Sequence, residues 1–324
     1  MINRRIACAS LALAPLAQPW AQAFPVRPIQ MLVGFAPGGG ADLVARVLAP
    51  HLVQELGQPV IVENRPGVGG NVATRYLATE AKADGHTILM GTIAALAINP
   101  NLYKEKIGYD PDRDLAPITN AVDSCNVLVV PASSPLHDVS QLVAACRTAS
   151  SLTYGSSGVG TAGHLAGVLL SSLTGTKPLH VPYKSGGGLM TAMLSGEVDF
   201  SFASGVTALA QVRGGKLRAL AVTTARRAAE LAQVPTMVEA GVAGFVSNNW
   251  YGIVAPAATP RPVIDRLNAA CVKVLGKPEV VAALRAQVLE ASPMSPDEFG
   301  TFMRAERAKW GKLIREAGVT LESV

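Results

Sequence analysis

The stretch VGFAPGGGADLVARVLAPHL, residues 33–52, places a glycine loop between an apolar run and a helical pattern. The apolar run begins at Met31 and stops at Pro37, three glycines follow, and apolar residues then recur at helical spacing. The first turn of a helix carries unpaired N–H groups, and glycines let an anion approach them closely. Because no Lys, Ser or Thr stands where a phosphate loop has one, the stretch predicts an anion site built from backbone N–H groups.

A second stretch, LTYGSSGVGTAGHLAG at residues 152–167, repeats this order of strand, glycine loop and helix. It contains the spacing GxGxxG, but no Asp or Glu stands between residues 165 and 196 to hold a ribose, which argues against a dinucleotide site. Ser156, Ser157 and Thr161 add hydroxyl donors to this loop. Either loop alone is also compatible with an ordinary strand-to-helix turn. Two such loops together favour a carboxylate that is held from both sides.

The rest of the chain alternates short apolar runs with helical patterns, which predicts an α/β fold with a mostly parallel sheet and helices on both faces. Ligands bind such sheets beyond the carboxyl ends of the strands. Two further glycine runs, in residues 64–78 and 181–194, precede helical patterns and could line the same cleft.

The chain is long enough for two domains rather than one. No linker rich in Pro, Gly or Ser separates them, so we expect the chain to cross between them on extended segments. We predict that residues 24–122 and 247–324 form one domain and residues 123–246 the other.

Residues 1–23 match a secretory signal, with a basic start, an apolar run and a small-residue cleavage site at Ala21-Gln22-Ala23. Its removal takes away Arg4 and Arg5 and changes the formal net charge from +5 to +3, because 26 basic and 23 acidic residues remain. This small excess has no basic run, which argues against nucleic-acid binding. We therefore expect a protein exported to the periplasm.

The sequence contains no clear catalytic, metal or cofactor motif. Cys125, Cys146 and Cys271 are far apart, so they predict no zinc site and leave a single disulfide open. A serine hydrolase that uses Ser156 or Ser157 with His164 is an alternative, although the spacing of a nucleophile elbow is absent. We expect no enzyme activity and no cofactor, and we expect His164 to orient the serine loop.

The chain resembles the Bug-type extracytoplasmic solute receptors, the binding proteins of tripartite tricarboxylate transporters. The resemblance extends over essentially the whole mature chain and includes FAPGGGADLVAR, GQPVIVENRPGVGGNVA, DGHTILMGT, YDPDRDLAPIT, LTYGSSGVGTAGHLAG, HVPYKSGGG and WYGIVAPAATP. It implies a fold similar to type II periplasmic binding proteins, with two α/β domains around a ligand cleft. It also implies a monomer that captures a small carboxylate and passes it to permease subunits. A periplasmic sensor that presents carboxylates to a signalling protein has the same fold and remains the alternative.

The resemblance places the carboxylate between residues 36–42 and residues 156–164. The ligand-binding residues that we expect are Phe35, Ala36, Gly39, Gly40, Ala41, Asp42, Ala94, Ser156, Ser157, Gly158, Gly160, Thr161, His164, Ala203, Ser204 and Trp250. Family members often have Phe-Asp-Asn where this chain has Phe202-Ala203-Ser204. Because that acid is missing, we expect a carboxylate ligand with a neutral or apolar remainder and no ammonium group.

Overall fold

The structure is a computed structural model that describes residues 24–148 and 152–321. The predicted signal segment, residues 1–23, lies outside the described residues. The strands are β1 (Ile29–Val33), β2 (Val60–Asn64), β3 (Thr87–Thr92), β4 (Leu115–Pro131), β5 (Thr153–Ser156), β6 (Leu179–Pro182), β7 (Phe200–Ser204), β8 (Leu217–Val222), β9 (Asn248–Pro256) and β10 (Leu289–Ala291).

The helices alternate with these strands over most of the chain. They are α1 (Gly40–Leu56), α2 (Asn71–Thr79), α3 (Asn99–Tyr103), α4 (Pro111–Asp114), α5 (Val139–Thr148), α6 (Ala162–Thr174), α7 (Gly186–Ser195), α8 (Gly205–Arg213), α9 (Arg261–Leu275), α10 (Pro278–Arg285) and α11 (Pro296–Glu316). Four short helical turns complete them: η1 (Val68–Gly70), η2 (Ala94–Ile98), η3 (Lys104–Ile107) and η4 (Ala229–Leu231). None of the helices in the described part of the chain combines the length and the apolar character that a membrane span needs.

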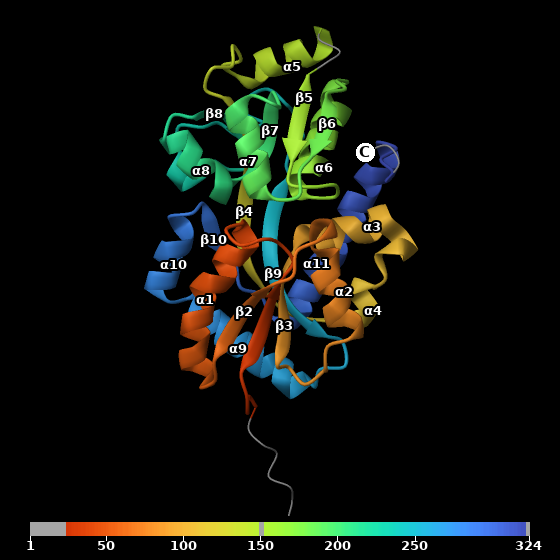
Figure 1. Ribbon diagram of the computed structural model, residues 1–324, viewed down its shortest axis with the longest axis vertical. Coiled ribbons are helices and arrows are strands. Elements are labelled where there is room, and N and C mark those ends of the chain that lie inside the picture. The colour runs from red at the N-terminus through yellow and green to blue at the C-terminus, as the bar shows by residue number, and fades with distance from the viewer. Residues whose placement is uncertain (1–23, 149–151, 322–324) are drawn as a thin grey trace, which may run out of the picture.

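The strands form one continuous sheet in the order β2-β1-β3-β9-β4-β7-β5-β6, and β8 and β10 pair with β4 as well. Strand β4 belongs to both ends of this sheet. Its residues 115–125 pair with β9, and its residues 126–131 pair with β7 and β8. In Figure 1, β4 and β9 run between a lower group of elements and an upper group. We call these groups the first lobe (α1–α4, α9–α11, β1–β3, β9 and β10) and the second lobe (α5–α8 and β5–β8).

The sheet is mixed, so the prediction of a mostly parallel sheet is wrong. Strand β1 is parallel to β2 and β3, and β5 is parallel to β6 and β7, as the strand–helix alternation predicts. Strand β9 is antiparallel to β3 and β4, and β4 is antiparallel to β7, β8 and β10. The difference arises because β4 carries the chain into the second lobe and β9 carries it back in the opposite direction.

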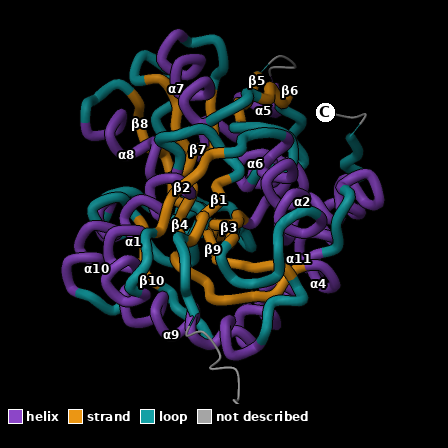
Figure 2. Tube along the Cα trace, turned by 60° about the horizontal axis from the view of Figure 1, so that its bottom comes forward, coloured by secondary structure: helices purple, strands orange, loops and turns teal. Residues whose placement is uncertain are grey.

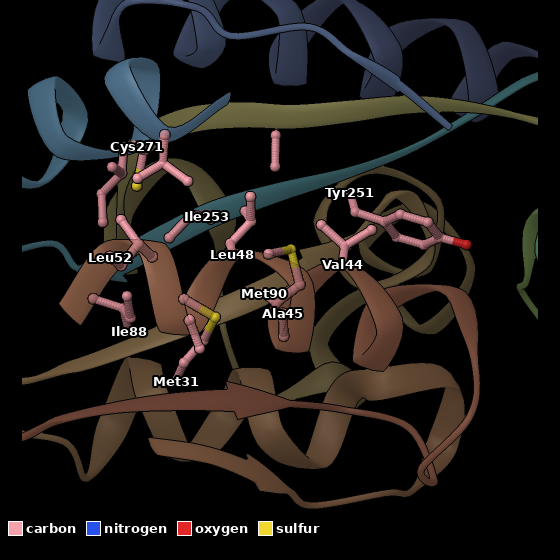
Figure 3. Close-up of a cluster of buried hydrophobic side chains, with 14 of the residues drawn as sticks. Met31, Val44, Ala45, Leu48, Leu52, Ile88, Met90, Tyr251, Ile253 and Cys271 are labelled. Carbon is pink, nitrogen blue, oxygen red and sulfur yellow. The ribbon is translucent and has the colours of Figure 1, made fainter. Parts of the chain in front are cut away.

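Apolar side chains pack on both faces of the sheet in each lobe, beneath helices that surround the strands (Figure 2). Successive residues of a strand face opposite sides, so Met31 belongs to one cluster of the first lobe and Leu32 to the other. Figure 3 shows Met31, Met90 and Ile253 of the sheet against Leu48 of α1. These cores fix the loops that follow β1 and β5 at the boundary between the lobes.

Candidate ligand-binding site

A cavity of about 90 Å³ lies where the two lobes meet. One water needs roughly 10–15 Å³ of such volume, so the cavity can hold several waters or a small organic molecule. No Lys, Arg, His, Asp or Glu is among the described residues that line it. The lining residues are Phe35, Ala36, Pro37, Gly39, Gly40, Ala41, Thr92, Ile93, Ala94, Asn126, Ser157, Thr161, Ala162, Gly163, Ser185, Gly186, Phe202, Ser204, Thr207, Asn249 and Tyr251.

The glycine loop between β1 and α1 is held by Asp42, which is buried in the first turn of α1. The Asp42 carboxylate accepts hydrogen bonds from the Gly38 backbone N–H at 2.9 Å and from Arg46 Nε at 3.0 Å. It also accepts from Asn64 Nδ2 at 2.8 Å, and the same nitrogen donates to the Phe35 carbonyl at 3.0 Å. Burial would raise the pKa of Asp42, but these donors outweigh it and keep the pKa below its ordinary value of 3.8. The carboxylate therefore stays charged and fixes the loop.

The loop between β5 and α6 is held by two histidines instead. The Gly160 backbone N–H donates to His164 Nδ1 at 3.1 Å, and His180 Nε2 lies 2.7 Å from Ser156 Oγ. The rings of His164 and His180 stack with their centroids 4.1 Å apart. Burial lowers the pKa of His164 to about 3 and that of His180 to about 4, so both rings are neutral near pH 7. His164 thus orients the loop, the role expected from its position in the sequence.

This arrangement does not fit a serine hydrolase. Ser156 is fully buried and does not line the cavity, and His180 Nδ1 has no partner among the described residues, where a catalytic triad places a carboxylate. Ser157 does line the cavity, but no histidine of the described residues hydrogen-bonds to its hydroxyl.

Three helices begin at the cavity without a side chain that caps them. The residues before α1, α6 and α8 are Gly39, Thr161 and Ser204, and none of them accepts a hydrogen bond from its helix through a side chain. All three line the cavity. Each helix N-terminus has free N–H groups and the equivalent of about half a positive charge. The wall therefore attracts an anion through backbone groups from both lobes.

The strands supply a polar side of the same cavity. Thr92 of β3 lies opposite Tyr251 of β9, and Asn126 of β4 lies opposite Ser204 of β7. Asn249 joins the two pairs, because its Nδ2 donates to the Tyr251 hydroxyl at 3.3 Å and lies 3.5 Å from Asn126 Oδ1. We call these five side chains the polar strip. It crosses four neighbouring strands from the first lobe to the second.

The structure brings most of the predicted contact residues to the cavity. The predicted residues that line it are Phe35, Ala36, Gly39, Gly40, Ala41, Ala94, Ser157, Thr161 and Ser204. Of the two further glycine runs that the sequence left open, residues 181–194 reach the cavity through Ser185 and Gly186, and residues 64–78 do not line it. The predicted residues that lie behind the wall are Asp42, Ser156, Gly158, Gly160, His164, Ala203 and Trp250.

Ala203 and Trp250 face away from the cavity for one common reason. Ala203 packs in an apolar cluster of the second lobe, and Trp250 is buried in the first lobe, where its Nε1 donates to Glu306 at 3.3 Å. Alternate residues of a strand face opposite sides of the sheet. The cavity therefore receives Ser204 from β7 and Asn249 and Tyr251 from β9. The missing acid at position 203 consequently does not shape the cavity wall.

The sequence reasoning missed the lining residues that come from the middle of the sheet. Those missed at the strands are Thr92, Ile93, Asn126, Phe202, Asn249 and Tyr251. Pro37, Ala162 and Gly163 also line the cavity and lie within the two predicted loop ranges, whereas Thr207 of α8 was missed. Alternation gave a usable signal for Asn249 and Tyr251, because both flank Trp250, a large apolar residue expected on the buried face of the strand.

Comparisons with known proteins agree with this geometry. The family model described as TctC, tripartite tricarboxylate transporter family receptor, matches residues 44–319. The chain belongs to this family. It is 35% identical to Protein BugT of Bordetella pertussis over 315 residues, which cover 96% of each protein. The predicted Bug-type family is therefore confirmed.

Solved structures of TctC-type receptors superpose closely on this chain. It is 33% identical to Rpa4515 of R. palustris, solved with adipate, with a TM-score of 0.88 over 92% of this chain and 99% of that one. It is 32% identical to the periplasmic binding protein BugD, with a TM-score of 0.86 over 92% of this chain and 99% of that one. These matches confirm the predicted fold class, that of a periplasmic binding protein with two α/β lobes.

Proposed function

We propose that this TctC-family receptor binds a small carboxylate between its lobes in the periplasm and delivers it to the membrane subunits of a tripartite transporter. The observation that carries the proposal is the cavity wall, which has no cationic side chain among the described residues but gathers three uncapped helix N-termini. The adipate in Rpa4515, a structural relative at 33% identity, is a carboxylate and supports this ligand class.

The proposed mechanism is closure of the lobes on the ligand. Helix α1 belongs to the first lobe, and α6 and α8 belong to the second, so neither lobe alone supplies all the N–H groups. A ligand that contacts both lobes binds the closed state more tightly and shifts the population toward it. The proposal keeps the predicted division, with residues 24–122 and 247–324 in one domain and residues 123–246 in the other. It also keeps export by residues 1–23 and a monomeric receptor.

The ligand class can be tested with matched acids and amides. Adipamide has the shape of adipate but no charge, so only the acid gains from the helix N-termini. We expect isothermal titration calorimetry to show binding of adipate or a shorter acid, and at least a tenfold loss for the matching amide. Equal binding of the two would contradict the proposal.

An ammonium group on the ligand should weaken binding. No carboxylate side chain of the described residues lines the cavity, so the ammonium would lose its water without gaining a partner. The sequence-based expectation of a ligand without an ammonium group, which was drawn from Ala203, is therefore now supported by the composition of the cavity wall. We expect glutamate to bind less tightly than glutarate, and the reverse order would remove this part of the proposal.

The transport role needs a test in cells. A strain without the chain should lose uptake of the bound acid, and the wild-type chain should restore it. The variant Gly40→Ala should not restore uptake, because a methyl group at Gly40 would overlap the Tyr251 hydroxyl at the cavity wall. Uptake that survives the deletion, together with loss of a transcriptional response to the acid, would favour the sensor instead.

A further inference from the structure

The short connection between α10 and β10 contains a valine in a backbone conformation that suits glycine. Val288 has a φ of 59°, in the left-handed region that a β-branched residue rarely adopts. A left-handed residue commonly ends a helix, and it is usually glycine. Helices α1, α6 and α7 follow this rule with Gly57, Gly175 and Gly196. Val288 keeps a side chain where these helices have none, so its surroundings must hold the strained backbone in place.

The Val288 side chain packs into the lobe opposite to its own. It is 5% exposed and belongs to the apolar cluster of the second lobe that includes Leu209 of α8. The next residue, Leu289 of β10, belongs to a cluster of the first lobe. Two consecutive residues of the first lobe therefore insert into the cores of different lobes.

Helix α8 makes the reciprocal contact at its first turn. Val206 belongs to α8 of the second lobe, yet it packs in the same first-lobe cluster as Leu289. The residue before it, Gly205, has no spare room, because an added methyl group would lie 3.3 Å from Val288 Cβ and 3.2 Å from the Cys125 carbonyl oxygen. Val288 therefore lies directly against the backbone at the start of α8.

The start of α8 is also part of the ligand cavity. Ser204, before the helix, and Thr207, in its first turn, both line the cavity. The free N–H groups of this N-terminus face a bound anion correctly only if the helix lies in the right place relative to α1 of the other lobe. Val288 itself does not line the cavity, so any effect on the ligand must pass through α8.

We infer that Val288 is a positioning residue for the ligand site, which sets the place of the α8 N-terminus relative to the first lobe through its contact with Gly205. Because α8 is one of the helices assigned to the carboxylate, this role rests on the proposed function. It also gives the strained backbone a purpose. A glycine at position 288 would relax the turn but would leave the start of α8 without support.

Two variants separate this role from a general contribution to stability. Val288→Gly releases the strain, which offsets the lost apolar burial, so we expect a melting temperature close to that of the wild type. It should nevertheless bind adipate about fivefold more weakly, the size of the contribution that one helix N-terminus makes to an anion. Val288→Thr keeps the β-branched shape but buries a hydroxyl, so it should lower the melting temperature by several degrees and keep the affinity within about twofold.

Val68 provides the matched control for the backbone conformation. Its φ is 47°, but its side chain is 54% exposed and it does not line the cavity. Val68→Gly should therefore keep the affinity within about twofold of the wild type. Calorimetry measures the binding of adipate, glutarate and succinate to each mature chain, and thermal unfolding without ligand measures stability.

The spacing between α8 and α10 gives a second readout. Arg213 of α8 and Ala283 of α10 are exposed, whereas the native cysteines of the described residues are buried, so spin labels can be attached at Arg213→Cys and Ala283→Cys. With saturating ligand, we expect Val288→Gly to broaden the distribution of distances between the labels. Val288→Thr and Val68→Gly should leave it as in the wild type.

The outcomes distinguish this role from the proposed function. Wild-type affinity in Val288→Gly would overturn the role of Val288 and leave the proposed function intact. An affinity that follows the melting temperature across the two Val288 variants would do the same, as would a loss of affinity without a change in label spacing. Failure of the wild-type chain to bind any of the three acids would overturn the proposed function, and the role of Val288 with it.

Discussion

At the scale of single residues, we expect Asp42 to affect ligand binding although its side chain does not line the cavity. Its carboxylate joins the glycine loop to α1 through Gly38, Arg46 and Asn64. The variant Asp42→Ala leaves the Gly38 N–H without its partner. We expect it to lower the free energy of unfolding by about 2 kcal/mol, typical of hydrogen bonds to a buried charge, and to weaken ligand binding. Urea unfolding and calorimetry measure the two effects.

A matched control separates this role from an ordinary ion pair. Asp265 also pairs with an arginine four positions away, Arg261, but both side chains are more than half exposed. Asp265→Ala should cost less than about 1 kcal/mol and should leave binding unchanged. Since the pKa of Asp42 is lowered in the folded state, its contribution is present above its ordinary value of 3.8 and is lost as the pH falls through the folded value. Equal effects of the two variants at pH 7 would contradict this role.

The residue scale also shows which parts of the site the sequence could predict. The glycine loops were predictable because a strand end, glycines and a helix start are neighbours in the chain. The polar strip was not, since Thr92, Asn126 and Ser204 are brought together only by the pairing of β3, β9, β4 and β7. Even when a strand is predicted correctly, neighbouring residues in it face opposite sides of the sheet. Ala203 and Trp250 therefore point away from the cavity, whereas their neighbours line it.

At the scale of elements, the loop between β5 and α6 should be sensitive to acid. His164 and His180 are buried and neutral, with pKa values lowered by burial to about 3 and about 4. In the unfolded chain they bind protons below about pH 6.5, so the unfolded state binds more protons than the folded state between pH 6.5 and 4. Stability is therefore lost as the pH falls through this range. We expect a loss of about 2 kcal/mol for each histidine between pH 7 and pH 5.

Urea unfolding at pH 7 and pH 5 measures this loss, and variants assign it. His180→Asn should remove about half of the acid sensitivity, because asparagine does not titrate in this range. His137→Asn, which changes an exposed histidine, is the control and should leave the sensitivity unchanged. If both variants retain the full loss, the acid sensitivity has another origin.

The elements themselves were predictable where hydrophobic periodicity is strong and local. Strand β1 and helix α1 follow from their patterns, and α1 ends at Gly57, whose φ of 72° suits glycine. Strand β4 is a single long strand that pairs with strands of both lobes. Strand β10 has only three residues and exists through its pairing with β4. Both elements are defined by partners far away in the chain, which local patterns do not encode.

At the scale of the whole molecule, the lobes already touch beside the cavity. Ala162 and Leu165 of α6 lie in one apolar cluster with Leu102 of the first lobe. Asn99, at the start of α3, is fully buried and faces the second lobe at Gly160. Its Nδ2 donates to Asn71 Oδ1 at 2.8 Å, which fixes the orientation of the amide. The contact between the lobes therefore includes a close approach of the Gly160 backbone to Asn99.

This approach predicts that Gly160→Ala opposes closure. A methyl group at Gly160 would overlap Asn99 Oδ1, and Gly160 also has a φ of 74°, which strains any other residue. Gly175 is the matched control, since its φ is 69° and an added methyl group meets nothing within 4 Å. Gly175→Ala should cost about 1 kcal/mol of stability from strain and leave ligand affinity unchanged. Gly160→Ala should cost a similar amount and also weaken binding by on the order of tenfold.

The equilibrium between open and closed lobes shows whether Gly160→Ala acts on closure or only damages the loop. Small-angle X-ray scattering with saturating ligand should show a larger radius of gyration for Gly160→Ala than for Gly175→Ala, because the added methyl group holds the lobes apart. The double variant Gly160→Ala with Asn99→Ala removes the overlap while the strain stays. It should recover the compact form and most of the lost affinity, since a close contact between two side chains makes their effects non-additive. Independent, additive losses would show that the contact between the lobes does not control closure.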